Sequence, residues 1–207
     1  MKEHKYHNLT DHVNCYFDNN FKIKTAKILP GEFYATNQDI AMTTLLGSCV
    51  SACLRDSESG IGGMNHFMLP DNSKLIGSHG NIGVGGRYGV HAMELLINQI
   101  LKLGGRREKL EAKVFGGGNV IENFTISNIG KQNADFILEY LQIEKIKIVS
   151  QDLLDVWPRK IFYWPKTGKV LVKKIKKTEA NTIFIEERNY SKQIIELPLK
   201  GDMEIFK

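Results

Sequence analysis

Cysteine is scarce in this chain of 207 residues, which contains only Cys15, Cys49 and Cys53. An odd number of cysteines without a secretory leader argues against a disulfide framework and fits a reducing compartment. Long apolar runs are also missing, since no stretch approaches the roughly 18 residues that a membrane span needs. The first residues, Met1–His7, are polar and lack the apolar segment of a signal peptide. These absences predict a cytoplasmic protein that is not embedded in a membrane.

Charge of one sign is in small excess, because 28 basic residues face 23 acidic ones and leave a net charge of +5. Such a charge suggests an acidic partner but is too small to identify one. Much of the excess lies in one stretch with no acidic residue, at Lys169, Lys173, Lys174, Lys176 and Lys177. This stretch predicts a solvated edge strand protected by lysines. Nucleic-acid binding has no supporting motif or interleaved aromatic residues.

Nucleotide-binding motifs are absent as well. The glycines of Gly83–Gly89 do not match Gly-x-Gly-x-x-Gly, and no Gly-Lys-Ser/Thr is present. We therefore interpret residues 71–89 as a mobile loop at the rim of a site. Arg87 in this loop is either a contact for an acidic partner or a plain surface arginine.

Hydrophobic periodicity predicts a mixture of strands and helices that does not alternate strictly, which argues against a doubly wound parallel fold. Residues 1–20 are expected to form a loose polar arm, 21–177 the main domain, and 178–207 a helical extension packed on that domain. Strands are predicted at 21–28, 32–37, 43–46, 49–54, 62–69, 112–115, 146–149, 160–164 and 170–175. Helices are predicted at 91–103, after a cap at Ser127 or Asn128, and at 182–195. In the last helix, Ile183, Glu187, Tyr190 and Ile194 share one side.

The tight turn Gly47-Ser48-Cys49 opens an alternating strand, so Cys49 sits where a side chain can meet free backbone N–H groups. His66 lies in the next predicted strand, and a hairpin would bring its imidazole near the Cys49 sulfur. A thiol nucleophile needs such a partner, because the imidazole takes up and returns the proton. Cys53 is interpreted as a small core residue. A zinc site of Cys49, Cys53 and His66 is discounted, since Cys-x₃-Cys along a straight strand separates the thiols too far.

Several motifs occur in an order that resembles one protein family. They are Thr43-Thr-Leu-Leu-Gly-Ser-Cys49-Val, Gly63-Met-Asn-His66-Phe-Met-Leu-Pro70, Arg87-Tyr-Gly, Ala112-Lys-Val-Phe-Gly-Gly-Gly-Asn119, Ile129-Gly-Lys-Gln-Asn133, Arg159-Lys-Ile-Phe-Tyr and Pro165-Lys-Thr-Gly168-Lys-Val. Together they resemble CheD, a family of chemoreceptor glutamine deamidases, over most of residues 21–176. The ending, residues 201–206, resembles the tail of longer members. One departure is Asp152-Leu-Leu-Asp155, where the family usually has a glycine pair after its late aspartate.

The resemblance implies an α+β fold, a layered α/β/β sandwich with mixed sheets that is related in its site layout to the catalytic domain of cytotoxic necrotizing factor. It implies a protein-glutamine deamidase with Cys49 as nucleophile, His66 as general base and acid, and Thr43 orienting His66 through its hydroxyl or carbonyl. Thr44 is the obvious alternative to Thr43. The N–H groups of Cys49 and Ser48 are oxyanion candidates, with Gly47 and Asn65 as further pocket candidates. No cofactor or metal is expected.

Two classes of function follow from the resemblance. The first is an enzyme that deamidates glutamines on the cytoplasmic helices of methyl-accepting chemotaxis receptors. The second is a binding module that docks on the receptor, or on a CheC-type phosphatase, without turnover. The intact Cys49, His66 and Thr43 favour catalysis, because a pure binding protein has no need of them.

Overall fold

The alternating segments form two five-stranded sheets in the computed structural model, which describes residues 13–70, 84–119, 129–176 and 181–196. The first sheet has the order β1 (Asn14–Asp18), β2 (Ile23–Lys27), β4 (Ala41–Leu46), β9 (Arg159–Trp164) and β10 (Lys169–Lys174). The second has the order β3 (Phe33–Thr36), β6 (Gly62–Asn65), β5 (Val50–Asp56), β7 (Leu110–Gly116) and β8 (Lys147–Leu153). The pairs β2–β4 and β7–β8 are parallel and the others antiparallel, so both sheets are mixed.

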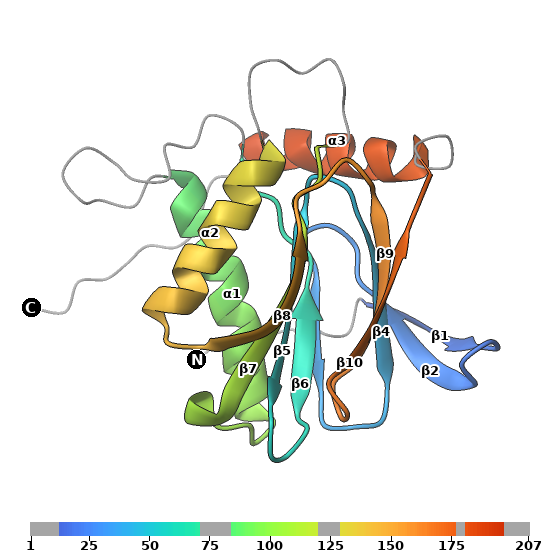
Figure 1. Ribbon diagram of the computed structural model, residues 1–207, viewed down its shortest axis with the longest axis vertical. Helices are drawn as coiled ribbons and strands as arrows, with labels where there is room; N and C mark the ends of the chain where they lie inside the picture. The colour runs from blue at the N-terminus through green and yellow to red at the C-terminus, as the bar shows by residue number, and fades with distance from the viewer. Residues whose placement is uncertain (1–12, 71–83, 120–128, 177–180, 197–207) are drawn as a thin grey trace, which may run out of the picture.

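Two helices, α1 (Val84–Lys102) and α2 (Ile129–Ile143), cover the outer face of the second sheet, whose other face packs on the first sheet (Figure 1). A short 3-10 turn, η1 (Arg107–Lys109), leads into β7. The layers are thus helix, sheet and sheet, which confirms the predicted α/β/β sandwich. Within the described residues, no helix is long and apolar enough to cross a membrane.

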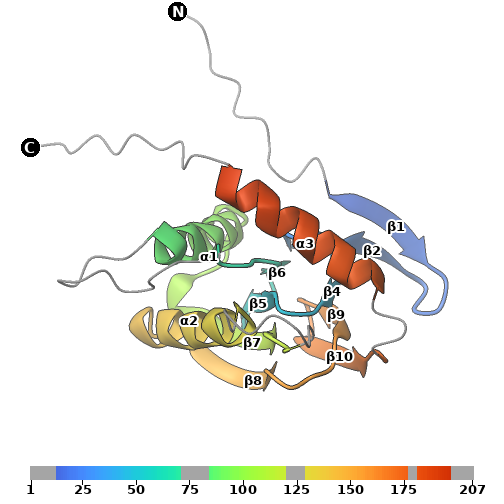
Figure 2. The ribbon, with the colours of Figure 1, turned by 90° about the horizontal axis from the view of Figure 1, so that it is seen from above.

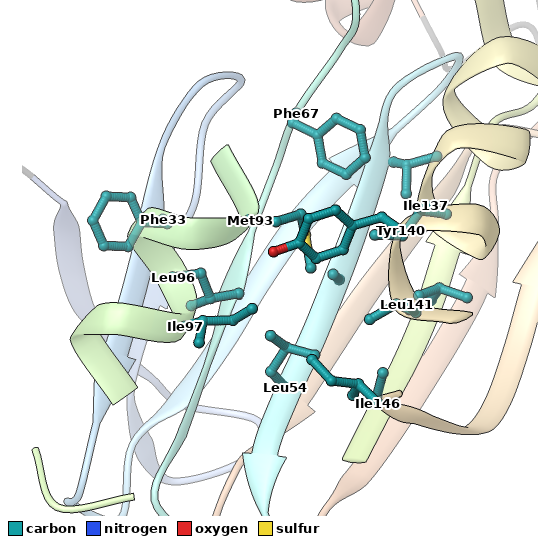
Figure 3. Close-up of a cluster of buried hydrophobic side chains, with 14 of the residues drawn as sticks. Phe33, Leu54, Phe67, Met93, Leu96, Ile97, Ile137, Tyr140, Leu141 and Ile146 are labelled. Carbon is teal, nitrogen blue, oxygen red and sulfur yellow. The ribbon is translucent and has the colours of Figure 1, made fainter. Parts of the chain in front are cut away.

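The alternation of β5 divides the core into two clusters. Val50, Ala52 and Leu54 face the helices, where they meet α1 and α2 side chains such as those of Met93 and Ile137 (Figure 3). Cys49 and Cys53 face the first sheet and lie in a second cluster between the sheets. All three cysteines are free, and Cys53 is a buried core residue as predicted.

Two predicted loop segments are wrong in part. Residues 14–18 are not part of a loose arm, because β1 pairs with β2 along its whole length. The expected loop over 71–89 ends earlier than predicted, since α1 begins at Val84. Gly89 lies within this helix, and its bare Cα lets α2 approach, since a Cβ would lie 2.5 Å from the Phe136 ring. Residues 71–83 and the predicted caps Ser127 and Asn128 lie outside the described residues.

The missing glycine pair falls between β8 and β9. Leu154 and Asp155 both have positive φ, at 65° and 74°. This conformation costs about 1–2 kcal/mol for a side chain with a Cβ, which explains why glycine suits the position. The buried guanidinium of Arg159 holds the turn, donating to the carbonyl oxygens of Asp152 and Leu154.

The helix α3 (Asn181–Glu196) confirms the last predicted helix, and it crosses one end of the two sheets (Figure 2). Ile183, Glu187 and Ile194 are buried and Tyr190 is half-buried, so the predicted face is the one that packs on the sheets. β10 is an edge strand with exposed Lys169, Lys173 and Lys174, as expected, while Lys177 lies outside the described residues.

Candidate active site

The turn Gly47-Ser48-Cys49 connects β4 in one sheet to β5 in the other. Its three carbonyl groups all point toward neighbouring backbone or α2. The Cys49 and Gly47 carbonyls accept hydrogen bonds from the N–H groups of Gly117 and Gly118, both at 2.7 Å, and the Ser48 carbonyl accepts one from Asn133 Nδ2 at 2.9 Å. This close approach requires glycine, because a Cβ at Gly116, whose φ is +112°, would lie 2.1 Å from the Cys49 oxygen.

With the carbonyls held on one side, the N–H groups of the same turn converge on the other. Gly47 and Cys49 donate to Oε1 of Glu187 at 2.8 and 3.0 Å, and Ser48 N–H donates to Oε2 at 2.9 Å. The Ser48 hydroxyl adds a bond of 2.7 Å to Oε2. The turn is therefore a nest of three backbone donors that holds one carboxylate.

His66 follows β6 and is fixed through its backbone. Its N–H donates to the Glu32 carbonyl at 2.9 Å, and its own carbonyl accepts from Gly31 at 2.8 Å. A ring nitrogen of His66, Cys49 Sγ and a Glu187 carboxylate oxygen lie within 4.8 Å of one another. The structure thus brings Cys49 and His66 together, as the sequence predicts.

Thr44 sets the tautomer of His66. Its hydroxyl oxygen lies 2.6 Å from the Ile28 carbonyl and 2.8 Å from His66 Nδ1. A hydroxyl has one hydrogen, and the carbonyl can only accept, so the threonine donates to Ile28 and accepts from Nδ1–H. This leaves Nε2 as the unprotonated nitrogen, and Nε2 is buried without a hydrogen-bond partner.

The prediction that Thr43 orients His66 is wrong in this geometry. The Thr43 hydroxyl donates to the Ile161 carbonyl at 2.8 Å, and its carbonyl accepts from the Ile28 N–H at 2.9 Å. Successive side chains of β4 point to opposite faces, so only one of the two threonines can face His66.

Asn65 also lies apart from the cysteine. Its Oδ1 accepts from the Ala52 N–H at 2.9 Å, and its Nδ2 donates to the Ala92 carbonyl at 3.3 Å. The side chain therefore links β5 to α1 on the helical side of the sheet. These contacts do not make Asn65 an oxyanion donor, but the residue does line the cavity beside His66, in keeping with its place as a pocket candidate.

Both reactive groups are neutral in this arrangement. Burial and then the neighbouring Glu187 carboxylate raise the pKa of the Cys49 thiol well above its usual value. Burial lowers the pKa of His66 to about 4, against the opposing attraction of Glu187. A protonated thiol beside an unprotonated Nε2 is the resting form of a general-base pair.

Cys49, His66 and Glu187 are the residue types that can bind a metal ion, but their hydrogen bonds do not fit one. Each Glu187 oxygen already accepts two hydrogen bonds, which fills the four acceptor positions of a carboxylate. Three N–H dipoles directed at the same point also favour an anion over a cation.

A cavity of about 240 Å³ opens on the His66 side of the site. Its lining combines residues from the His66 loop, α1 and α3, among them Glu32, His66, Tyr88, His91 and Tyr190. The cavity is large enough to hold water next to the imidazole.

Comparison with known proteins places this chain in a family. The family model described as CheD chemotactic sensory transduction matches residues 68–174. The chain is 53% identical over 194 residues to the probable chemoreceptor glutamine deamidase CheD of Methylobacillus flagellatus, covering 94% of this chain and 95% of that protein. It is 52% identical over 194 residues to the probable chemoreceptor glutamine deamidase CheD 1 of Dechloromonas aromatica, covering 94% of each. The chain belongs to the CheD family.

A CheD-like protein from Cupriavidus metallidurans, named probable chemoreceptor glutamine deamidase CheD, is 46% identical over 196 residues, with 92% of this chain and 88% of that protein covered. These alignments span the Cys49 and His66 region and most of α3, whereas the CheD family model begins at residue 68, after both residues.

Glu187 is the site residue whose role the sequence did not reveal. It was predicted on the packing side of the last helix but was given no function. The available signal was its position, because a carboxylate on an otherwise apolar helix face is rarely buried unless donors satisfy it. The CheD motifs could not point to it, since none of them includes a residue of α3.

Proposed function

We propose that this protein hydrolyses the side-chain amides of glutamine residues in methyl-accepting chemotaxis receptors. Its relatives carry the name chemoreceptor glutamine deamidase at about 50% identity over nearly the whole chain. The observation that carries the proposal is the occupant of the backbone nest. The three N–H groups beside Cys49 bind the carboxylate of a glutamate side chain, which is the group that glutamine deamidation produces.

The reaction begins with the Cys49 proton, which moves to His66 Nε2 as the sulfur attacks Cδ of the glutamine. A C–S bond forms, and the carbonyl oxygen becomes an oxyanion that the N–H groups of the turn stabilise. His66 returns the proton to the nitrogen, the C–N bond breaks and ammonia leaves. Water then adds to the thioester with His66 as base, the C–S bond breaks, and the products are glutamate and the regenerated thiol.

Thr44 serves this sequence by holding Nδ1–H, so that Nε2 faces the thiol as an acceptor. When Nε2 takes the proton, the Thr44 hydroxyl and the Ile28 carbonyl remain as partners for the Nδ1 side of the imidazolium. Cys49, His66 and Thr44 are thus the nucleophile, the base and the positioning residue of the proposal.

Receptor helices are the substrate of this proposal, and a CheC-type phosphatase is a candidate binding partner. The cytoplasmic location and the likeness of the site to the catalytic domain of cytotoxic necrotizing factor belong to the same proposal. A pure docking module has less support, because a tautomer-fixed imidazole next to a thiol contributes nothing to docking.

The test measures ammonia release, and glutamate formation by peptide mass, from a receptor cytoplasmic fragment with the protein in excess. Cys49→Ala and His66→Ala should each abolish conversion while the protein stays folded. Cys53→Ala is the matched control, since it removes the other buried thiol and should cost only about 1 kcal/mol of stability. Conversion that persists in Cys49→Ala would refute the thioester route. Equal kcat/KM for free glutamine and the receptor fragment would refute the receptor assignment.

A further inference from the structure

One face of α3 is apolar except for a buried carboxylate. Ile183, Glu187 and Ile194 are 2%, 3% and 5% exposed, and Tyr190 lies between the last two. A leucine at position 187 would avoid the cost of burying a carboxylate, but it would leave the N–H groups of the Gly47–Cys49 turn without a partner. A buried carboxylate instead needs several donors to be tolerated, and the packing of α3 alone does not require one.

The donors that satisfy Glu187 are the ones that the proposed reaction needs. The N–H groups of Gly47, Ser48 and Cys49 bind its two oxygens at 2.8–3.0 Å. A substrate carbonyl oxygen cannot reach these N–H groups while the carboxylate is present. Glu187 and a substrate glutamine are therefore mutually exclusive.

Contacts made by the half of α3 that follows Glu187 hold the helix over the site. The Tyr190 hydroxyl is hydrogen-bonded to the Tyr88 hydroxyl of α1, and its ring lies against Gly31, where a Cβ would be 2.6 Å from it. Ile194 packs in the cluster between the sheets, near Ala26 and Ile28. The helix thus bridges α1 and the first sheet with the catalytic turn beneath its centre.

Covering the site also suppresses the nucleophile. Cys49 is 0% exposed, so neither a substrate nor an alkylating reagent reaches its sulfur in this arrangement. Burial, and then the charge of Glu187 on α3, raise the pKa of the thiol, which disfavours the thiolate. The covered state is inactive by access and by electrostatics together.

We propose that α3 is an intramolecular inhibitor that fills the substrate groove, by which we mean the surface over Cys49 that α3 covers, and places Glu187 in the backbone nest as a product-like side chain. The inference rests on the proposed function, since it assigns Glu187 the place of the deamidated glutamine. Because Glu187 reaches the nest from an α-helix, the groove accepts a helix-borne side chain of this length. The activating partner is accordingly a substrate helix that carries glutamine and displaces α3.

Tethering makes this competition strong. A segment of the same chain acts at an effective concentration that reaches the millimolar range for short linkers. The apparent affinity of a competing helix falls by the fraction of molecules in which the groove is open. Weakening α3 should therefore lower KM for the receptor fragment and expose Cys49.

The experiment compares Glu187→Ala, Tyr190→Ala and Glu186→Ala with the full chain unchanged in α3. All four proteins also carry Cys15→Ser, which removes the exposed cysteine. Glu186 is the matched control, because it precedes Glu187 and makes only a 3.9 Å ion pair with Lys27. Two readouts are taken, namely the iodoacetamide alkylation rate of Cys49, mapped by peptide mass, and kcat/KM for deamidation of a receptor fragment. Alkylation does not depend on any deamidase activity.

Alkylation and kcat/KM should both rise about tenfold or more in Glu187→Ala, which loses several charge-assisted hydrogen bonds. Both should also rise in Tyr190→Ala and stay unchanged in Glu186→Ala. Receptor deamidation at the same rate in all four proteins, with unchanged alkylation, would overturn the inference and leave the proposed function intact. Faster alkylation with no deamidation by any of them would overturn the proposed function and leave the covering of Cys49 by α3 supported.

Discussion

Replacing Glu187 by glutamine turns the inhibitor into a substrate. In Glu187→Gln, the amide carbonyl takes the place of Oε1 and keeps the Gly47 and Cys49 N–H bonds. The NH₂ group takes the place of Oε2, where it cannot accept from the Ser48 N–H, while the Ser48 hydroxyl can rotate to accept instead. This orientation leaves one backbone donor unsatisfied, and the opposite one leaves two.

One unsatisfied buried donor costs about 1–3 kcal/mol, which weakens the closed state by about 5- to 150-fold. In the fraction that stays closed, the carbonyl of the introduced glutamine rests in the proposed oxyanion nest with Cys49 and His66 beside it. We expect the variant to convert this glutamine to glutamate during or after expression and so to recover the inhibited state.

Peptide mass analysis of freshly purified and incubated Glu187→Gln measures this conversion directly. The rate should be independent of protein concentration, because the reaction is intramolecular. The double variant Glu187→Gln, Cys49→Ala should keep its glutamine. A glutamine that stays intact at position 187, in a folded variant that deamidates a receptor fragment, would refute the placement of this residue in the substrate position.

Three further outcomes follow from other parts of the molecule. Thr44→Ala should lower kcat more than it changes KM, because the Nδ1–H partner of His66 is lost, and Thr44→Ser should partly restore kcat. Thr43→Ala should cost only about 1 kcal/mol of stability, from the lost hydrogen bond to the Ile161 carbonyl. The reverse pattern would contradict the assigned tautomer. Burial lowers the pKa of His66 to about 4 from 6.5, so the unfolded chain binds more protons than the folded chain between these two pH values. The free energy of unfolding, measured in urea melts, should therefore fall by on the order of 3 kcal/mol from pH 7 to pH 4. The same pH slope in His66→Gln would show that other groups cause it. Leu154→Gly should raise the free energy of unfolding by about 0.5–1 kcal/mol, because φ at this residue is positive. Leu153→Gly in β8 should lower the free energy of unfolding. A lower free energy of unfolding in both variants would argue against strain at Leu154.

Periodicity in the sequence predicted most of this architecture, because the core alternation is regular. The alternation of Val50, Ala52 and Leu54 placed β5 between two layers, and the 183, 187, 190 and 194 spacing indicated the packed face of α3. Helix α1 was predicted to start too late because its first turns contain Gly85, Gly86 and Gly89. Glycine disfavours a helix on its own, so the local sequence indicated a loop. Gly89 instead allows close packing on Phe136, a residue distant in sequence.

The candidate site was predicted in part for a similar reason. Cys49 and His66 are near each other along the chain, and their residue types alone suggest a nucleophile and a base. The choice between Thr43 and Thr44 depended on which face of β4 meets the His66 loop, and that is set by how the two sheets pack together and not by the local sequence. Glu187 lies 138 residues from Cys49, so no local pattern could connect them.

The identity of residue 187 also has a consequence at the level of the gene. Codons for glutamate and glutamine differ in a single base, so a point mutation readily exchanges them. If position 187 is converted in place, a gene encoding either residue yields the same mature helix. The exchange would then be corrected after translation by the protein's own chemistry, and selection would act on the rate of maturation instead of the final resting state.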